Sequence, residues 1–573
     1  MDIKYELAKI IAKEIELDLE EIVTAIEIPT NTDMGDYSFP CFRLSKTMRK
    51  APPLIASELS GKLGDTFSMD ELSFVESVEA IAGYVNFRLR KEFLVSEAFN
   101  AILAKGESYG SSDIGAGKTI VIDYSSPNIA KPMHIGHIRT TMIGAAISKT
   151  LKFLGYNVVG INYLGDWGTQ FGKVAVAINK WGGEQAPSGG VKSLVDLYVK
   201  FHDEAESVPT LIDEARAWTV KMEAGDEESL ALWREICDMS RRELDIIYKR
   251  LGIEFDSYRG ESYYNDKMEP VVQELRDKNL LTESQGAQVV MMDEWNMPPC
   301  LILRKDGGTL YPTRDIASIM DRYELYNFHK ALYVTGLEQK LHFAQWFKVV
   351  ELMGYDYAKD LEHISYGLIS LDSGKMSTRK GSIIYLDELL DEAKNRTLEI
   401  INERNPELPD KELVADQVGI GAIIFNDLYN NRIKDVTFSF EKMLNFEGET
   451  GPYVQYAAAR ANSVLLKAGV EISQIAKGDI DYSLITDKAS IEIAKLIYSY
   501  PDKILESANR YEPYIISRHL MAIAQAFNYF YHENPILSAE PNIRDARLAV
   551  VYSVRAVLKA GLGLLNISAP EKM

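Results

Sequence analysis

A short run of β-branched residues followed by two prolines is the feature that most limits how this chain can fold. Residues 119–124 read TIVIDY, a composition typical of a buried parallel strand, and Pro127 and Pro132 prevent the strand from continuing. Beyond Gly136, apolar residues recur mostly at three- to five-residue steps and stop at Gly155, which predicts a helix packed on a core. The sequence therefore predicts a strand, a tight turn and a helix start, in that order.

Two histidines, His134 and His137, lie at the predicted start of this helix. Free backbone N–H groups and the helix dipole favour a phosphate at such an end, and Gly136 lacks the side chain that would keep a ribose or an adenine away. A structural pair or half of a metal site would have the same spacing. Because the chain has only eight histidines, two of them in four residues beside a glycine favour a nucleotide site.

A second segment, GKMSTRKG at 374–381, places three cations in eight residues after a predicted strand at 363–371. Positive side chains in a loop suit a polyphosphate, although a short Lys/Arg cluster is more often a solvated surface turn. The occurrence of both segments in one chain carries more weight than either segment alone.

Length and composition predict a multidomain globular protein. The chain has 573 residues, 46% of them hydrophobic and 26% charged, which is too long for one hydrophobic core. No apolar run approaches membrane-spanning length, and the N-terminal residues resemble an acid-rich amphipathic helix rather than a signal peptide, so we expect a cytoplasmic protein without membrane contact. The three cysteines are widely separated and offer neither a disulfide framework nor a zinc spacing, so we expect no structural metal.

The patterns along the chain predict a small N-terminal α/β domain, a nucleotide-binding domain with a helical insertion at about 181–260, a connecting helical segment and a C-terminal all-α bundle. These four regions span 1–115, 116–387, 388–420 and 421–573. Strands are expected at 74–78, 84–89, 119–124, 288–292, 300–303, 331–335 and 363–371, the last four completing the nucleotide-binding fold. Helices are expected at 2–26, 51–63, 411–434, 451–468, 488–509, 512–532 and 542–566.

A histidine-glycine-histidine signature followed by a Lys-Met-Ser loop resembles the class I aminoacyl-tRNA synthetases, whose Rossmann-like domain binds ATP between those motifs. Three longer segments are similar to arginyl-tRNA synthetases: SPNIAKPMHIGHIR at 126–139, NYLGDWGTQFGK at 162–173 and YPTRDIA at 311–317. The resemblance extends from GYVNFRL at 83–89 to GETGPYVQYAAAR at 448–460. It implies a Rossmann-like class I catalytic core with an insertion, an N-terminal domain that contacts the tRNA D-loop and a C-terminal anticodon-binding domain.

The resemblance implies a ligase for protein synthesis that uses ATP and Mg²⁺ as a substrate complex, activates L-arginine to its adenylate and transfers it to the 3′-terminal adenosine of tRNA(Arg). We expect a monomer. A carboxylate attacks the α-phosphate and is already ionised at neutral pH, so no general base is needed. The resemblance assigns ATP contacts to His134, Gly136, His137, Lys375, Met376 and Ser377, and catalytic roles to His134, His137 and Lys375; a catalytic role for Lys131 is our own hypothesis.

The loop departs from the general class I pattern at its fourth position, where Thr378 replaces a second lysine. Lys131, Arg379 or Lys380 could supply the missing positive charge. We favour Lys131, because it lies three residues before His134 in the same turn.

Five positions match the family's arginine pocket: Asn128, Glu261, Tyr311, Asp315 and Gln339. A guanidinium removed from water needs carboxylates, so Glu261 and Asp315 would take it, with Asn128 and Gln339 nearer the substrate's amino and carboxylate groups. Without the family match, Asp315 could equally serve the N-terminal region of a helix.

The resemblance also implies tRNA contacts. Tyr84 and Asn86 match positions that read an unstacked D-loop base, although a plain edge strand would look the same. Tyr453, Tyr456 and Arg460 could face the anticodon loop, although aromatic residues at helical spacing more often belong to a core.

The net charge of −21 does not by itself suggest a protein that binds RNA. From position 421 onward, however, the chain has 16 basic and 17 acidic residues, so the excess negative charge lies almost entirely in the first 420 residues. Local basic surfaces can then contact phosphates, and binding should depend on salt.

Two other functions are compatible with parts of these patterns. The first is an enzyme of the same fold that activates another amino acid, such as lysine or glutamate, and the YPTRDIA and SPNIAKPMHIGHIR segments argue against it. The second is a catalytically silent tRNA-binding or regulatory paralogue, which would have no reason to keep both histidines, the Lys-Met-Ser loop and the pocket carboxylates.

Overall fold

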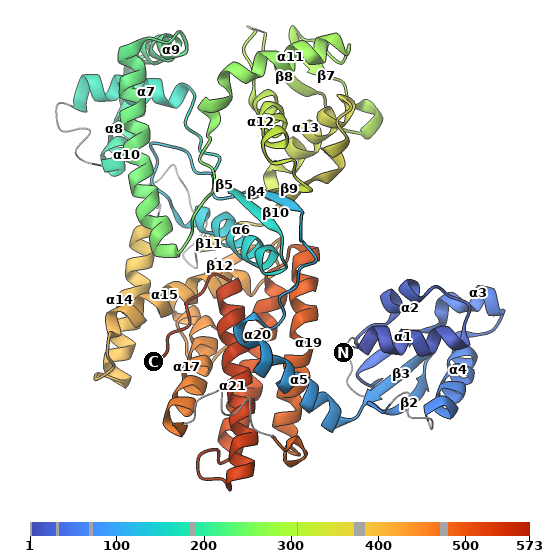
Figure 1. Cartoon of the computed structure of the whole chain (residues 1–573). Coiled ribbons are helices and arrows are strands. Elements are labelled where there is room, and N and C mark those ends of the chain that lie inside the picture. The colour runs from blue at the N-terminus through green and yellow to red at the C-terminus, as the bar shows by residue number, and fades with distance from the viewer. Residues whose placement is uncertain are drawn as a thin grey trace. The chain divides into compact units, whose positions relative to one another are not determined.

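The computed structural model describes residues 3–29, 34–67, 73–182, 190–305, 307–371, 384–469 and 480–573. Figure 1 shows the chain coloured from its N-terminus to its C-terminus, and its contacts divide it into two compact units. One unit comprises 1–109, 464–500 and 525–557, and the other comprises 110–463, 501–524 and 558–573.

The N-terminal part of the first unit is an antiparallel sheet covered by helices. Its strands are β1 (Tyr37–Pro40), β2 (Val75–Ile81) and β3 (Tyr84–Leu89), in the order β1-β3-β2. Its longer helices are α1 (Ile3–Glu14), α2 (Leu19–Ala25), α4 (Pro52–Phe67) and α5 (Lys91–Lys105). The prediction of one helix over 2–26 was wrong, because the Asp18 side chain accepts a hydrogen bond from the Glu20 backbone N–H and starts a second helix.

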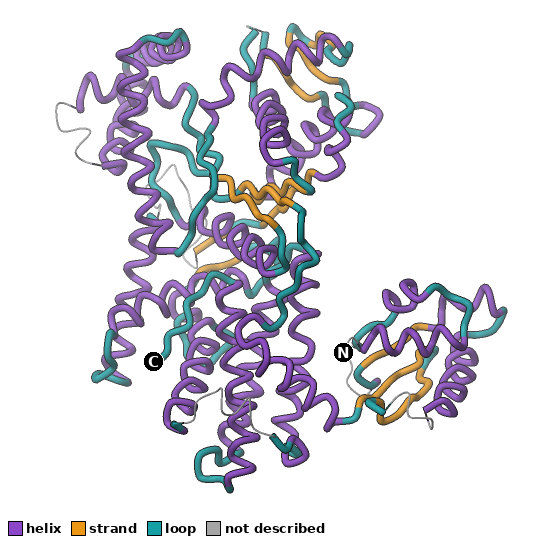
Figure 2. The backbone as a smooth tube through the Cα atoms, in the orientation of Figure 1, coloured by secondary structure: helices purple, strands orange, loops and turns teal. Residues whose placement is uncertain are grey.

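The second unit contains the parallel sheet that the TIVIDY run predicts. Its strands are β4 (Thr119–Asp123), β5 (Asn157–Ile161), β9 (Lys330–Gly336) and β10 (Leu361–Tyr366), in the order β10-β9-β4-β5. All three strand pairs are parallel. Helix α6 (Ile135–Phe153) begins at the histidine turn and, in Figure 2, runs beside these strands.

Three of the predicted strands do not pair as expected. The strands β7 (Ala287–Val290) and β8 (Cys300–Leu303) do not join the parallel sheet, but form a separate antiparallel sheet with β6 (Thr282–Ser284). The expected strand over 363–371 is divided, because its second part, β11 (Ile369–Leu371), pairs with β12 (Val436–Phe438) instead.

The region in which an insertion is expected is helical, and a helix also lies directly before position 181. These helices are α7 (Thr169–Ala177), α8 (Gly190–Ser207), α9 (Thr210–Glu223) and α10 (Glu227–Leu251). Helix α10 is capped at both ends. The Asp226 side chain accepts a hydrogen bond from the Ser229 N–H at its start, and Gly252, with φ +67°, ends it.

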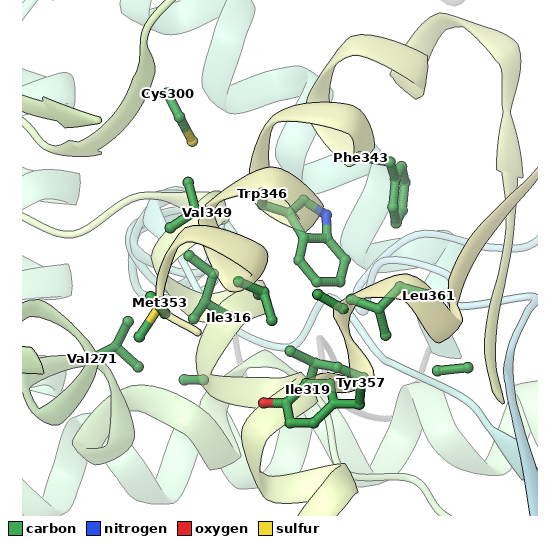
Figure 3. Packing of buried hydrophobic residues seen from close by; sticks show 14 of the residues in the cluster. Val271, Cys300, Ile316, Ile319, Phe343, Trp346, Val349, Met353, Tyr357 and Leu361 are labelled. Carbon is green, nitrogen blue, oxygen red and sulfur yellow. The ribbon is translucent and has the colours of Figure 1, made fainter. Parts of the chain in front are cut away.

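A large apolar cluster fixes the helices on the other side of the sheet from α6. It joins α11 (Met268–Asp277), α12 (Tyr311–Tyr326), α13 (Lys340–Leu352) and β8 to Val121 of β4. Figure 3 shows Trp346 and Val349 of α13 close to Ile316 of α12, and Trp346 is fully buried. The cluster therefore holds α12, whose first residues carry two of the expected pocket side chains.

The C-terminal third is helical, as predicted. Its longer helices are α14 (Leu386–Arg404), α15 (Lys411–Leu428), α17 (Gly451–Ala468), α19 (Lys488–Arg510), α20 (Tyr514–Glu533) and α21 (Pro541–Leu564). The helix predicted over 411–434 ends at Leu428, and β12 follows it. Among the helices that the structure describes, none has the length and apolarity needed to cross a membrane.

Candidate active site

The turn after β4 has an unusual backbone that the insertion helix α10 supports. Ser125, Ser126 and Ala130 have φ values of +69°, +41° and +60°, each of which strains a residue with a side chain by about 1–3 kcal/mol. The Ser125 hydroxyl lies 2.8 Å from the hydroxyl of Tyr248, and the Ala130 N–H donates to the Ser240 hydroxyl at 3.1 Å. Tyr248 and Ser240 both belong to α10, so the insertion holds the turn in this shape.

The two histidines cap α6 reciprocally. The Gly136 N–H donates to Nδ1 of His134 at 3.0 Å, and the His134 N–H donates to Nδ1 of His137 at 3.1 Å. Because both Nδ1 atoms accept hydrogen bonds, the proton of each neutral ring lies on Nε2. Each imidazole is therefore a hydrogen-bond donor at its outer edge, beside a helix N-terminus.

Both rings are held in the neutral form. Burial lowers the pKa of His137 to about 3, and the neighbouring His134 lowers it further. Burial and the charge of Lys131 also lower the pKa of His134. Gly136 is required by this arrangement, since a Cβ there would lie 2.8 Å from Cε1 of His134.

The Lys-Met-Ser segment lies outside the described residues, so the structure does not place the side chains predicted there. These are Lys375, Met376, Ser377, Thr378, Arg379 and Lys380. The chain that follows them is described: the Ile135 N–H donates to the Ile384 carbonyl at 3.2 Å, and the Leu386 N–H donates to the Met133 carbonyl at 2.9 Å. Residues 384–386 therefore pair with the histidine turn.

Lys131 is exposed in the same turn. Its Nζ lies 5.8 Å from the centre of the Tyr198 ring, and Nζ of Lys173 lies 5.9 Å from the same ring. Burial and the charge of Lys131 lower the pKa of Lys173. Two cations thus share one aromatic ring close to the histidines.

A cavity of about 440 Å³ brings together all five residues expected to bind arginine. They are Asn128, Glu261, Tyr311, Asp315 and Gln339. The turn after β4, the segment before α11, the start of α12 and the start of α13 supply them. Sequence reasoning did not identify the other polar residues of the cavity wall, which include Tyr163, Tyr333, Thr335 and His342.

The carboxylates of this pocket already have partners. His342 Nε2 lies 2.6 Å from Asp315 Oδ2, and Arg314 Nη1 donates to Glu261 Oε2 at 3.0 Å. Burial raises the pKa of Glu261 to about 7, although Arg314 acts in the opposite direction. Position 342 is three residues after Gln339, and no sequence pattern marks it, because its contact depends on how α12 packs on α13.

A buried ion pair lies beside the same cavity, because Asp123 also lines its wall. Arg322 of α12 and Asp123 of β4 approach to 2.8 Å, and burial raises the pKa of Asp123. The Arg322 guanidinium lies 5.2 Å from the Tyr163 ring centre, and the buried Tyr163 hydroxyl has no partner among the described residues. A buried hydroxyl of this kind is available to a ligand.

The residues expected to contact tRNA differ in their exposure. Asn86 is buried, and its Oδ1 accepts from the Ser38 hydroxyl at 2.5 Å, so it joins β1 to β3 and is not open to a base in this conformation. Tyr84 is half-buried against Phe42. On α17, the Arg460 guanidinium lies 4.6 Å from the centre of the exposed Tyr456 ring, while Tyr453 is half-buried. Within the described residues, no group of three or more His, Cys, Asp or Glu side chains could hold a metal ion.

Comparison with known proteins covers almost the whole chain. A family profile described as the class I tRNA synthetase (R) catalytic domain matches residues 98–440. An arginyl tRNA synthetase N-terminal domain profile matches 1–89, and a DALR anticodon-binding domain profile matches 454–573.

Full-length relatives agree with these profiles. The chain is 51% identical to the arginine–tRNA ligase of Alkaliphilus metalliredigens and 49% identical to that of Clostridioides difficile, over all of each chain. The solved Thermus thermophilus arginyl-tRNA synthetase has a TM-score of 0.82 and is 25% identical, with 100% of this chain and 99% of that chain covered. The histidine turn, the five-residue pocket and these matches lead to one assignment: this chain belongs to the arginyl-tRNA synthetases.

Proposed function

We propose that this protein joins L-arginine to tRNA(Arg) in two steps, using MgATP as substrate. Arginine first attacks the α-phosphate and forms arginyl-adenylate, and the 3′-terminal adenosine of the tRNA then accepts the arginyl group. The observation that supports this most strongly is the cavity that collects Asn128, Glu261, Tyr311, Asp315 and Gln339 beside the capped histidine turn.

In the first step the arginine carboxylate is the nucleophile and the pyrophosphate leaves. Negative charge grows on the phosphoryl oxygens, so fixed donors accelerate the reaction. His134 and His137 supply Nε2–H donors whose direction the capping hydrogen bonds fix. Lys375 would bind the β- and γ-phosphates. Loss of one such donor should lower the rate by about 10²–10³.

Arginine is distinguished from lysine by a pair of carboxylates. The guanidinium would bond to Asp315, which His342 orients, and to the Glu261 oxygen that Arg314 does not hold. A lysine ammonium is a point charge that cannot satisfy both acceptors in the same fork, and the unpaired acceptor disfavours it.

Lys131 is our candidate for the charge that Thr378 does not supply. It is exposed in the histidine turn, and its charge reaches both imidazoles. We expect Lys131→Ala to slow adenylate formation, while Arg379→Ala and Lys380→Ala have smaller effects. Intact adenylation in Lys131→Ala, together with its loss in Arg379→Ala, would assign the role to Arg379.

The tRNA would contact both ends of the chain. Tyr84 is proposed to stack on a D-loop base, and Tyr453, Tyr456 and Arg460 are proposed to face the anticodon loop, where Tyr456 is exposed and lies against the Arg460 guanidinium. The monomeric state and the cytoplasmic location stay predictions, which analytical ultracentrifugation and cell fractionation would check.

The deciding experiment is arginine-dependent exchange of labelled pyrophosphate into ATP, with Mg²⁺, with and without tRNA(Arg), and with lysine as control. Exchange with arginine and not with lysine supports the proposed reaction and its specificity. A requirement for tRNA would mean that tRNA completes the site. Binding of tRNA without exchange under either condition would instead favour a silent tRNA-binding protein.

A further inference from the structure

Arg139 is a fully buried arginine two residues after His137 on α6. Its Nε donates to Asp427 Oδ1 at 2.9 Å, and its Nη1 donates to the carbonyls of Gly367 and Leu368 at 2.6 and 3.1 Å. Its Nη2 donates to the Arg432 carbonyl at 3.1 Å. One guanidinium thus joins α6 to three other segments of the same unit.

The carbonyls of Gly367 and Leu368 belong to the chain that leads into the Lys-Met-Ser segment. The other side of this chain is also held: the Gly367 N–H donates to the Arg432 carbonyl, and the Leu368 N–H donates to Asp435 Oδ1 at 2.7 Å. A Cβ at Gly367 would lie 2.5 Å from the Ile433 carbonyl oxygen, so only glycine fits there. Strands β11 and β12 continue the same contact.

Stability alone is a weak reason for such a pair. Removing a guanidinium and a carboxylate from water costs about as much as their attraction returns, so a buried ion pair is weak evidence for stability, and the geometry that it imposes is the alternative explanation. Asp427 of α15 is itself fully enclosed, and burial raises the pKa of its carboxyl to about 6. The geometry imposed here is the spacing between the histidine helix and the chain that enters the second phosphate-binding segment.

We propose that Arg139, held by Asp427, is a positioning residue for adenylate formation. It fixes residues 365–368 relative to His134 and His137, so that the donors of the two motifs reach the same triphosphate. The inference rests on the proposed function and adds a residue that touches neither substrate. A displacement of about 1 Å in such a framework can lower a rate by roughly 10²-fold without weakening binding.

The experiment compares Arg139→Lys with Arg250→Lys. Arg250 is a matched control, because its Nη2 donates to Asp416 Oδ1 of the same helix α15 at 2.7 Å and its guanidinium bonds to Asp391 and Asp416 rather than to residues 365–368. The single-turnover rate of arginyl-adenylate formation is measured with tRNA present and divided by the fraction of active sites. We expect Arg139→Lys to be slower by about 10²-fold, with the KM for arginine and the Kd for tRNA within about twofold of wild type, and Arg250→Lys to be unchanged.

A second variant separates positioning from stability. Arg139→Met with Asp427→Leu removes both charges, which often leaves stability unchanged. If the double variant has a melting temperature near that of the wild type and still forms adenylate slowly, the proposal holds. A wild-type rate in either variant, or losses that disappear after division by active sites, would overturn it. Absence of arginine-dependent exchange in the wild type would instead reject the proposed function, and this inference with it.

Discussion

Glu261 gives the pocket a dependence on pH near neutrality. Burial raises the pKa of its carboxyl to about 7, with Arg314 opposing the rise and Asp315 and Asp166 adding to it. In the proposed pocket, arginine would bind the ionised form of this carboxyl, so we expect the KM for arginine to rise by about tenfold per pH unit below 7. The slope should vanish in Glu261→Gln and persist in Glu283→Gln, which changes an exposed carboxylate on β6.

The same raised pKa affects stability in the opposite sense. The folded protein binds the Glu261 proton more tightly than the unfolded chain does, so its contribution is present at low pH and is lost as pH rises through about 7. As pH rises through about 7, the affinity for arginine should therefore increase while the contribution of the Glu261 carboxyl to the stability of the free enzyme decreases. A KM that stays constant from pH 6 to 8, in contrast, would mean that Glu261 does not contact the substrate.

Gly165 keeps Asn128 in the pocket. A Cβ at this position would collide with the Asn128 side chain, whose backbone also bridges to Gly165. We expect Gly165→Ala to raise the KM for arginine several-fold and to leave the KM for ATP nearly unchanged. Gly563→Ala is the control, because a Cβ there has no atom within 4 Å. Steady-state exchange kinetics at varied arginine and ATP check both variants.

Single residues were predictable where local chemistry selects them. Two histidines beside a glycine at a helix start indicate a phosphate site without any tertiary information. Their reciprocal capping was not predicted, because histidine is an uncommon cap and the contact depends on ring orientation. His342 and Arg139 were also not identified, since the partners that define them lie on other elements.

At the scale of elements, pairing was harder to predict than existence. A short apolar run does not show which sheet the strand will join. The strands near 288 and 300 were therefore assigned to the parallel sheet, whereas they belong to a separate antiparallel sheet. The division of 363–371 into β10 and β11 depends on Arg139 and on residues 432–438, which sequence periodicity does not reveal. The helices α17, α19, α20 and α21 were predictable to within about two residues at each end, because their own apolar patterns nearly suffice.

The pair that joins β4 to α12 should be essential for stability. Asp123 and Arg322 are both fully enclosed, and removal of one partner leaves the other charge buried. We expect Asp123→Asn to lower the free energy of unfolding by about 3–5 kcal/mol, measured by urea titration. Glu362→Gln, which breaks the exposed Lys330–Glu362 pair between β9 and β10, should cost less than about 1 kcal/mol. Equal losses in the two variants would contradict the distinction.

At the scale of the whole molecule, we expect the uneven charge to limit which nucleic acids bind. Excess negative charge in the first 420 residues disfavours general adhesion to nucleic acid, whereas residues 421–573 are nearly neutral. We expect log Kd for tRNA(Arg) to rise linearly with log salt concentration, by a slope of roughly one per phosphate contacted. Arg460→Ala should reduce that slope by about one, and Arg544→Ala, which changes a half-buried arginine on α21 that pairs with Asp545, should leave it unchanged. Filter binding at salt concentrations from about 50 to about 300 mM would measure the slope of log Kd in each variant.

Arg139 and Asp427 are 288 positions apart, and this separation sets an order of events during synthesis. A ribosome that adds roughly 5–20 residues per second needs on the order of 15–60 s to reach Asp427 after it has made Arg139. During that interval the Arg139 guanidinium has no carboxylate partner, and burial of an unpaired charge is costly. Helix α6 therefore cannot pack stably against residues 367–368. On the proposed role of Arg139, a nascent chain that already displays both histidines would not yet form adenylate, because residues 367–368 are not yet fixed to α6.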